Sequence, residues 1–233
     1  MHMTPALGLH DTVKMLLADD PSAWERGYYD CLLRRSVAGQ PAFPLLDFEY
    51  ERRDLLYRLV NEKTTGDGPV DFLEFGVFNG DSFAQWLRLN AHPESRFYGF
   101  DSFEGLPEDW EAAGKKKGDF DAQGRLPRIN DPRARFVKGW FDQTLPAFLK
   151  TWTPRNPVIA HLDADLYSST LCVLMQLDAH LAPGSALVFD EFAGVDEFAA
   201  FHSYARCRGR RWRFLAARRD FVKVAVALDA PGC

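Results

Sequence analysis

The sequence predicts an α/β fold in which helices cover both faces of a mostly parallel sheet. Short apolar runs typical of buried strands recur along the chain, and helical patterns separate most of them. This alternation requires right-handed crossovers, which place helices on both faces of a parallel sheet. A length of 233 residues, of which 46% are apolar, suits one large domain with a substantial core.

Residues 1–66 are predicted to form an N-terminal helical extension. Apolar residues recur three and four positions apart between residues 10 and 65, as on one face of a helix. Turn-forming residues at 64–69 then end the helical pattern. The chain therefore divides into this extension and a second region, residues 67–233, that contains the predicted sheet.

Six segments have the length and composition of strands. They are residues 70–76, 96–100, 134–138, 157–162, 185–189 and 221–228. The last segment alternates apolar and polar residues and is expected to be an edge strand. Residues 104–131 are rich in charge, glycine and proline and lack periodicity, so they are expected to form a mobile lid, with plain disorder as the alternative.

The composition argues against several classes of protein. The net charge is -5, with 28 basic and 33 acidic residues, which disfavours nucleic acid as a partner. No run approaches the roughly 20 apolar residues of a membrane span, and the N-terminus lacks a signal-peptide pattern, so a cytoplasmic protein is expected. The four cysteines have no metal-binding spacing and are expected to be free thiols.

The first strand leads into a glycine loop that suits ligand binding. In an open parallel sheet, ligands bind beyond the carboxyl ends of the strands. Gly76 and Gly80 would let the backbone approach a ligand closely, and the Glu74 carboxylate could bind an ammonium group. The loop is not a GxGxxG sequence, which disfavours a dinucleotide, and a purely structural turn remains the alternative.

Polar and aromatic residues also follow the second and third strands. Asp101 ends the second strand about 20 residues after the glycine loop, where an acid can accept both hydroxyls of a ribose. A helix cap is the alternative for this residue. After the third strand, Trp140 and Phe141 could lie against an adenine, although core packing is equally consistent with their position.

Acidic residues end the fourth and fifth strands. Asp163 and Asp165 follow the fourth strand, and Asp190 and Glu191 follow the fifth. Carboxylates that converge repel one another unless a cation lies between them, and oxygen ligands of this number suit Mg²⁺. Helix capping or pairing with Arg and Lys is the alternative interpretation of these residues.

Four motifs in this order resemble those of the macrocin O-methyltransferase family, class I enzymes that use S-adenosylmethionine and a metal ion to methylate sugar hydroxyls. The motifs lie at residues 73–80, 100–107, 137–146 and 162–170. The resemblance runs from about residue 71 to residue 198, and it implies a Rossmann-like fold with a central, mostly parallel seven-stranded sheet.

The resemblance also implies a set of binding residues. For S-adenosylmethionine these are Glu74, Phe75, Gly76, Asn79, Gly80, Ser82, Asp101, Ser102, Phe103, Gly139, Trp140, Phe141 and Asp163. For Mg²⁺ they are Asp163, Asp190 and Glu191. The family usually has two aspartates where this chain has Asp190 and Glu191.

The expected activity is transfer of a methyl group from S-adenosylmethionine to a hydroxyl of a small acceptor, a sugar or natural-product diol held by the metal. Asp163 is the expected general base, with His161 and His202 as alternatives. The alternative functions are a metal-independent N- or carboxyl-methyltransferase, a nucleotide-sugar dehydrogenase or epimerase, and a non-catalytic protein that binds S-adenosylmethionine. A homo-oligomer is expected.

Overall fold

The computed structural model describes residues 21–49 and 52–230. The chain forms two compact units, one that ends at Gln40 and one that begins at Pro41. In the first unit, the described helix is α2 (Pro21–Ala38). The part of the predicted helical extension before residue 21 lies outside the described residues, and the sheet belongs to the second unit.

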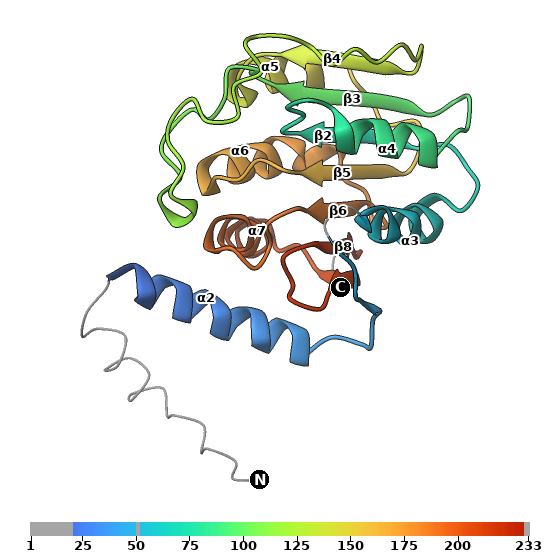
Figure 1. Ribbon diagram of the computed structural model, residues 1–233. Helices are drawn as coiled ribbons and strands as arrows, with labels where there is room; N and C mark the ends of the chain where they lie inside the picture. The colour runs from blue at the N-terminus through green and yellow to red at the C-terminus, as the bar shows by residue number, and fades with distance from the viewer. Residues whose placement is uncertain (1–20, 50–51, 231–233) are drawn as a thin grey trace. The chain divides into compact units, whose positions relative to one another are not determined.

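The second unit is built on a mixed sheet that has eight strands among the described residues, one more than the seven that the family resemblance implies (Figure 1). The strands are β1 (Leu45–Leu46), β2 (Asp71–Phe75), β3 (Arg96–Asp101), β4 (Ala134–Lys138), β5 (Val158–Leu162), β6 (Ala186–Phe189), β7 (Trp212–Arg218) and β8 (Val224–Leu228). Their order is β1-β7-β8-β6-β5-β2-β3-β4. β8 is antiparallel to both of its neighbours and the other pairs are parallel, which confirms the predicted mostly parallel α/β sheet.

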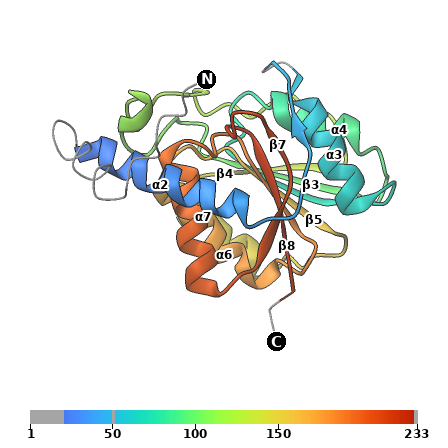
Figure 2. The same cartoon turned by 90° about the horizontal axis from the view of Figure 1, so that it is seen from below.

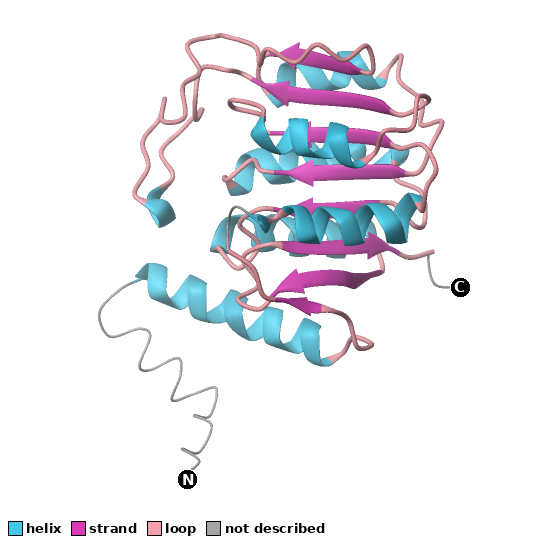
Figure 3. Cartoon of the chain, turned by 45° about the vertical axis from the view of Figure 1, so that its right-hand side comes forward, coloured by secondary structure: helices cyan, strands magenta, loops and turns pink. Residues whose placement is uncertain are grey.

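Helices cover both faces of this sheet. They are α3 (Asp54–Thr65), α4 (Asp81–Leu89), α5 (Phe141–Leu149), α6 (Tyr167–Leu177) and α7 (Val195–Arg208), with short 3-10 turns η2 (Glu111–Ala113) and η3 (Asp178–His180). Figures 2 and 3 show α3 and α4 on one face and α6 and α7 on the other. None of the helices in the described part of the chain is long and apolar enough to cross a membrane.

Burial on both faces explains the composition of the central strands. Every residue of β2 and β5 is buried, and most of these residues are apolar, the exceptions being Asp71, Glu74 and His161. α3 presents Leu56, Tyr57 and Val60 to the same core. The compact unit thus includes α3, whereas the sequence pattern places a boundary after residue 66; the division of roles between residues 1–66 and 67–233 stays a prediction.

Two details of the sheet differ from the sequence analysis. The edge-strand prediction for residues 221–228 is wrong, because β8 lies between β6 and β7 and is buried throughout. Its neighbour Lys223, which the alternation places toward solvent, is itself buried. The sequence pattern also does not reveal β7, which follows directly on a run of arginines, or the two-residue β1 that pairs with it at Ala217 and Arg218.

Candidate cofactor-binding and active site

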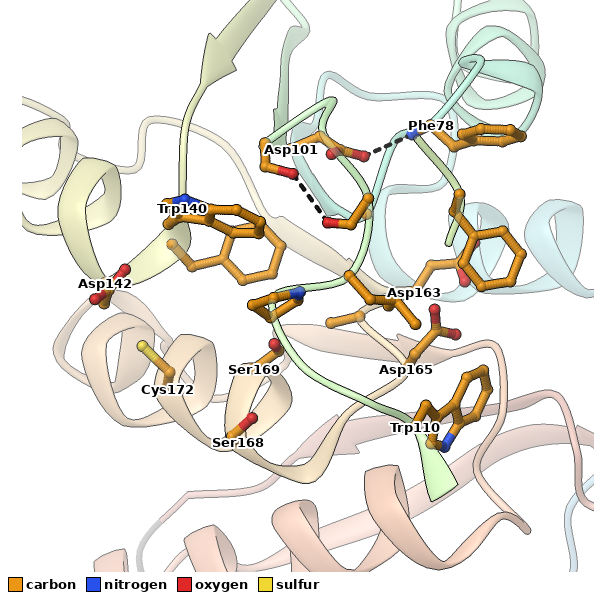
Figure 4. Close-up of a pocket in the computed structure, with 18 of the residues that line it drawn as sticks. Phe78, Asp101, Trp110, Trp140, Asp142, Asp163, Asp165, Ser168, Ser169 and Cys172 are labelled. Atoms are coloured by element: carbon orange, nitrogen blue, oxygen red, sulfur yellow. Dashed lines mark hydrogen bonds between the residues drawn. The ribbon is translucent and has the colours of Figure 1, made fainter. Parts of the chain in front are cut away.

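The strand order reverses at β2, which has β3 on one side and β5 on the other. Beyond the carboxyl ends of these strands lies a cavity of about 770 Å³, a size that suits a small-molecule ligand. The strand ends, the first turns of α5 and α6, and the loop of residues 104–131 line it (Figure 4). The cavity therefore lies where an open α/β sheet binds its ligands.

Gly76 sits where the ends of β2 and β5 meet. Its φ is 91°, and a Cβ atom there would lie 1.7 Å from the carbonyl oxygen of Asp163. The Asp163 amide in turn donates to the carbonyl of Phe75 at 2.9 Å. Because only glycine combines this φ with such a close approach, the glycine in the first loop has a definite structural cause.

Asp101 binds the backbone of that same loop. One of its carboxylate oxygens accepts the amides of Val77 and Phe78 at 2.8 and 2.7 Å, and the other accepts the amide of Phe103 at 2.6 Å. Asp101 also lines the cavity (Figure 4). A carboxylate offers about four acceptor positions, so three amides leave room for a ligand hydroxyl.

A buried row of charges runs behind the cavity wall. His161 is 0% exposed and lies between Glu74 and Asp190, with its Nδ1 3.5 Å from Glu74 Oε1 and its Nε2 3.7 Å from Asp190 Oδ1. Burial by itself lowers the pKa of His161, but the two carboxylates outweigh it and raise that pKa to about 10. The imidazole is therefore protonated at neutral pH, which removes it as a general base.

Asp190 is held by a second cation. The Lys223 Nζ atom lies 2.5 Å from Asp190 Oδ2, and both side chains are almost completely buried. Burial raises the pKa of Asp190, but His161 and Lys223 outweigh it and keep that pKa below its usual range. Asp190 is therefore ionised and paired on both of its oxygens.

Asp163 and Asp165, in the turn between β5 and α6, have the opposite electrostatic environment. Burial and the neighbouring Asp190 raise the pKa of Asp163 well above its ordinary value. Burial, with Glu191 and Asp190 as further causes, raises the pKa of Asp165 to about 7. A carboxyl group with a pKa of about 7, as at Asp165, can take up and release a proton near neutral pH, as a general base requires. The sequence indicates that Asp165 belongs to the acidic cluster, but it does not indicate this role.

The acidic residues do not fit Mg²⁺ as they are placed. In the part of the chain that the structure describes, His161, Asp163 and Asp190 each bring one ligand atom within 4.8 Å of the others, and Glu191 is not in this group. The Glu191 amide donates to the buried carboxylate of Glu197 at 2.9 Å. With one cationic side chain on each side of Asp190, the group lacks the set of free oxygen ligands that Mg²⁺ prefers. Two of the three predicted Mg²⁺ ligands, Asp163 and Asp190, thus converge with His161, but the pairing of Asp190 with Lys223 and the position of Glu191 do not fit the predicted set.

The structure brings about half of the predicted cofactor residues to the cavity. Those that line it are Gly76, Asp101, Ser102, Gly139, Trp140, Phe141 and Asp163. Those outside the lining are Glu74, Phe75, Asn79, Gly80, Ser82 and Phe103. Most of the second group are buried, and Ser82 donates a hydrogen bond to Glu74. Of the alternative bases, His202 is only partly buried on α7 and does not line the cavity.

Two groups of residues that line the cavity were not predicted from the sequence. Asp142 and Gln143 come from the first turn of α5, and Ser168, Ser169 and Cys172 come from α6. Figure 4 shows Asp142 and Cys172 near Trp140, on the side of the cavity away from Phe78. Their position could have predicted this role, because the first turn of a helix that follows a strand end faces the ligand-binding cavity.

The loop of residues 104–131 supplies one wall. Its lining residues are Gly105, Leu106, Pro107, Trp110, Lys117 and Phe120. The Trp110 Nε1 atom donates to Asp196 at the start of α7 at 2.9 Å, and the Ser168 hydroxyl donates to Glu108 at 2.5 Å. The loop is thus fastened to the beginnings of two helices, while its predicted mobility stays a prediction.

A sequence model of the family described as macrocin-O-methyltransferase matches residues 9–210. The chain belongs to the macrocin O-methyltransferase family. This confirms the resemblance drawn from the four motifs. Since a match of this extent covers the cavity-lining strands and helices, the site described above belongs to the family region.

Two curated relatives are named as O-methyltransferases. The chain is 34% identical over 173 residues, 64% of its length, to the 8-demethyl-8-(2,3-dimethoxy-alpha-L-rhamnosyl)-tetracenomycin-C 4'-O-methyltransferase of Streptomyces olivaceus. It is 24% identical over 176 residues, 64% of its length, to the demethyldecarbamoylnovobiocin O-methyltransferase of Streptomyces niveus. The matches cover 62% and 66% of these proteins, so the chain spans less than two thirds of either.

Solved structures of methyltransferases share the fold. The calicheamicin methyltransferase CalS11 superposes with a TM-score of 0.60 at 21% identity, over 97% of this chain and 99% of that one. The O-methyltransferase NovP gives 0.58 at 19% identity, over 88% and 100%. An O-methyltransferase of Bacillus cereus in complex with SAH gives 0.52 at 14% identity, over 94% and 95%. The predicted Rossmann-like methyltransferase fold is confirmed.

Proposed function

We propose that this chain is an S-adenosylmethionine-dependent O-methyltransferase that methylates a hydroxyl of a small, uncharged sugar-bearing acceptor. The charge of the cavity carries this proposal. Among the described residues, six acidic side chains and one lysine line it: Asp101, Asp142, Asp163, Asp165, Asp190, Glu191 and Lys117. S-adenosylmethionine carries a sulfonium and an ammonium cation, which an acidic cavity attracts. Family membership supplies the class of reaction.

The cofactor would occupy the side of the cavity that the second, third and fourth strand ends form. Asp101 would bind the ribose with its remaining acceptor position, and Trp140 and Phe141 would contact the adenine. The methionine part would lie along the loop at Gly76, where the absence of a Cβ atom leaves the backbone bare. Phe78, Trp110 and Asp165 line the side of the cavity away from Trp140 and would face the acceptor (Figure 4).

The chemistry asked of the protein is modest. S-adenosylmethionine supplies an already activated methyl group when bound. The chain then has to hold an acceptor hydroxyl in line with that group and to remove its proton. Asp163 is the proposed base, because it lines the cavity directly beside Gly76, and Asp165 two residues later would share the proton with it.

The electrostatics of the cavity also restrict the acceptor. A phosphorylated acceptor, such as a nucleotide sugar, would bring several negative charges against six acidic side chains and a single Lys117. An uncharged glycoside avoids this repulsion. The name of the Streptomyces olivaceus relative describes methylation of a rhamnosyl compound, which agrees with a glycoside acceptor. A homo-oligomeric state stays a prediction.

The Mg²⁺ that the resemblance implies at Asp163, Asp190 and Glu191 is not part of this proposal. Asp190 is already paired with Lys223 and His161, and Glu191 lies outside the group of converging ligand atoms. Proton removal by Asp163 needs no metal ion in the site as it is built. The proposal is therefore methylation of a hydroxyl without a metal ion, which differs from the metal-independent N- or carboxyl-methylation that the sequence left open.

Methyl transfer from isotope-labelled S-adenosylmethionine tests this proposal directly. The purified protein is incubated with a panel of uncharged glycosides and with nucleotide sugars of matching sugar structure. We expect label in one or more glycosides, and turnover reduced at least about 100-fold in Asp163→Asn, which keeps the shape of the side chain but cannot act as a base. S-adenosylhomocysteine should bind this variant as it binds the original protein.

Unchanged turnover in Asp163→Asn would remove that residue from the mechanism, and transfer only to nucleotide sugars would contradict the proposed acceptor class.

A further inference from the structure

Lys223 lies at the acidic edge of the sheet because β8 is antiparallel to its neighbours. Phe189 of β6 pairs with Val224 of β8, so the next residues beyond this pair, Asp190 and Lys223, face each other. The carboxyl ends of the parallel strands and the beginning of β8 therefore meet at the same edge. A lysine directly before β8 reaches the acidic ends of the other strands.

The contacts of Lys223 are specific and buried. Its Nζ atom lies 2.5 Å from Asp190 Oδ2 and donates to the Asp190 carbonyl oxygen at 3.3 Å. Only 1% of the residue is exposed. An ammonium group leaves water at a high cost in free energy, so it persists at such a place only when fixed negative charge surrounds it.

Lys223 begins a row of alternating charges. Asp190 lies next to it, His161 follows at 3.7 Å from Asp190, and Glu74 follows at 3.5 Å from His161. Ser82 ends the row by donating to Glu74. Lys223 and His161 thus lie against different oxygens of Asp190, so side chains of the protein itself occupy both sides of that carboxylate.

We propose that Lys223 is a positioning residue that occupies the place against Asp190 which a divalent cation would need, and that it keeps this edge of the cavity assembled without a metal ion. The ammonium group repels a divalent ion at Asp163 and Asp190 and engages one of the oxygens that would bind it. The catalytic consequence, turnover that survives removal of divalent ions, rests on the proposed function. The consequence for cation binding does not, because it concerns the protein alone.

Binding of Mn²⁺ alone to the full chain tests the proposal, with the signal of free Mn²⁺ followed by electron paramagnetic resonance. We expect the original protein to bind Mn²⁺ at this site no more tightly than the millimolar range, and Lys223→Met to bind it at least about tenfold more tightly. Asp190→Asn in the Lys223→Met background should abolish that gain. Lys117→Met is the control, since it removes the lysine that lines the cavity but forms no ion pair with Asp190, and it should leave Mn²⁺ affinity at the level of the original protein.

Thermal unfolding supplies a second readout. Lys223→Met should lower the Tm, because the buried Asp190 carboxylate loses its ion pair. Mn²⁺ should restore part of this loss. Adding Asp190→Asn to Lys223→Met should restore the Tm without Mn²⁺. Lys223→Arg keeps the charge and should behave as the original protein. If Lys223→Met does not fold, Lys223→Gln carries the same predictions.

Two results would overturn the proposal. One is tight, micromolar Mn²⁺ binding to the original protein that Asp190→Asn removes. The other is an Mn²⁺ affinity that neither Lys223→Met nor Lys223→Gln changes. Failure of methyl transfer or of S-adenosylhomocysteine binding would instead count against the proposed function, so the two claims fail separately.

Discussion

Gly76 shows how one residue sets the geometry of the cavity. Its positive φ turns the chain away from β2, and the missing Cβ atom lets the carbonyl of Asp163 approach. The proposed base and the loop proposed to hold the cofactor are in this way fixed against each other. Alanine at this position meets two obstacles, a left-handed backbone conformation and a collision with backbone atoms.

A comparison of two glycine variants separates those obstacles. Gly209 has a φ of 63°, and nothing lies within 4 Å of the place that a Cβ atom would take, so Gly209→Ala meets only the backbone cost of about 1–2 kcal/mol. Gly76→Ala should cost about 1–3 kcal/mol more, because the collision forces the strand ends apart. Urea unfolding measures both losses. Equal losses in the two variants would show that the close approach of Gly76 to Asp163 contributes nothing.

At this scale the sequence predicts which strand ends are polar, but it does not predict which partners they find. Asp101, Asp163 and Asp190 are visible as acids that follow apolar runs. The pairing of Asp190 with Lys223 depends on an antiparallel strand 33 residues later, and no local pattern encodes that register. The same limit applies to His161, whose two carboxylate neighbours lie on other strands.

The loop of residues 104–131, which covers the cavity, is held to the rest of the protein by few side-chain hydrogen bonds. Its two arms pair with each other, as in the hydrogen bond from the Leu106 amide to the carbonyl of Asp119 at 2.9 Å. Trp110 ties the tip to Asp196 on α7, and Ser168 on α6 binds Glu108. Because the tip relies on these side-chain bonds, we expect them to control its opening.

Trp110→Phe tests this role of the tip. The variant keeps an aromatic ring at the cavity wall but loses the bond from Nε1 to Asp196. We expect amide hydrogen exchange in residues 104–120 to become about 5- to 10-fold faster, the effect of losing one hydrogen bond that contributes about 1 kcal/mol. Lys116→Ala is the control, because it removes only the exposed pair with Asp109 in the same loop. Equal exchange in both variants would contradict the fastening role of Trp110.

A second fastening point joins the end of α6 to α7. Asp178 accepts hydrogen bonds from Tyr204 and Arg210, each at 2.7 Å, and its side chain is 17% exposed. Burial raises the pKa of Asp178, but these two bonds outweigh it and leave the pKa below its usual value. The bonds therefore stabilise the fold above the unfolded pKa of about 4, and their contribution disappears as the pH falls through the folded pKa.

Asp178→Asn should accordingly lower the free energy of unfolding by about 1–3 kcal/mol near pH 7. The difference between the variant and the original protein should shrink at about pH 3, where the carboxyl group is already largely protonated in the unfolded chain. Urea unfolding at the two pH values gives both numbers. Asp220→Asn, which breaks a largely exposed pair with Arg218, is the control and should cost less than about 1 kcal/mol. A pH-independent loss in Asp178→Asn would refute this explanation.

The errors at the scale of elements have a common cause. A strand that is buried on both faces can be predicted where apolar residues dominate it, as in β5, whose one polar residue is His161. The pattern around β8 suggests an edge because Lys223 resembles a solvent-facing residue, and β7 is hidden because the adjacent arginines mask its apolar residues. In both cases a charged side chain is expected to face water, whereas Lys223, directly before β8, forms a buried ion pair with Asp190.

For the whole molecule, the separation of charge is more informative than its sum. The net charge of -5 is small for 233 residues, yet acidic groups gather at one edge of the sheet, where they line the cavity. Part of this charge is balanced internally by Lys223 and His161, and the remainder faces the cavity. That remainder is the basis for expecting a cationic cofactor and an uncharged acceptor.

Calorimetric titration of S-adenosylhomocysteine into the purified protein tests the central claim most directly. We predict binding in the micromolar range, no dependence on EDTA, and an affinity at least about 100-fold weaker in Asp101→Ala, which loses both the proposed ribose contact and the support of the loop at Val77 and Phe78. Asp109→Ala, an exposed acid in the covering loop, should bind as the original protein does. Absence of binding, or equal affinity in Asp101→Ala, would contradict the assignment of this cavity to the cofactor.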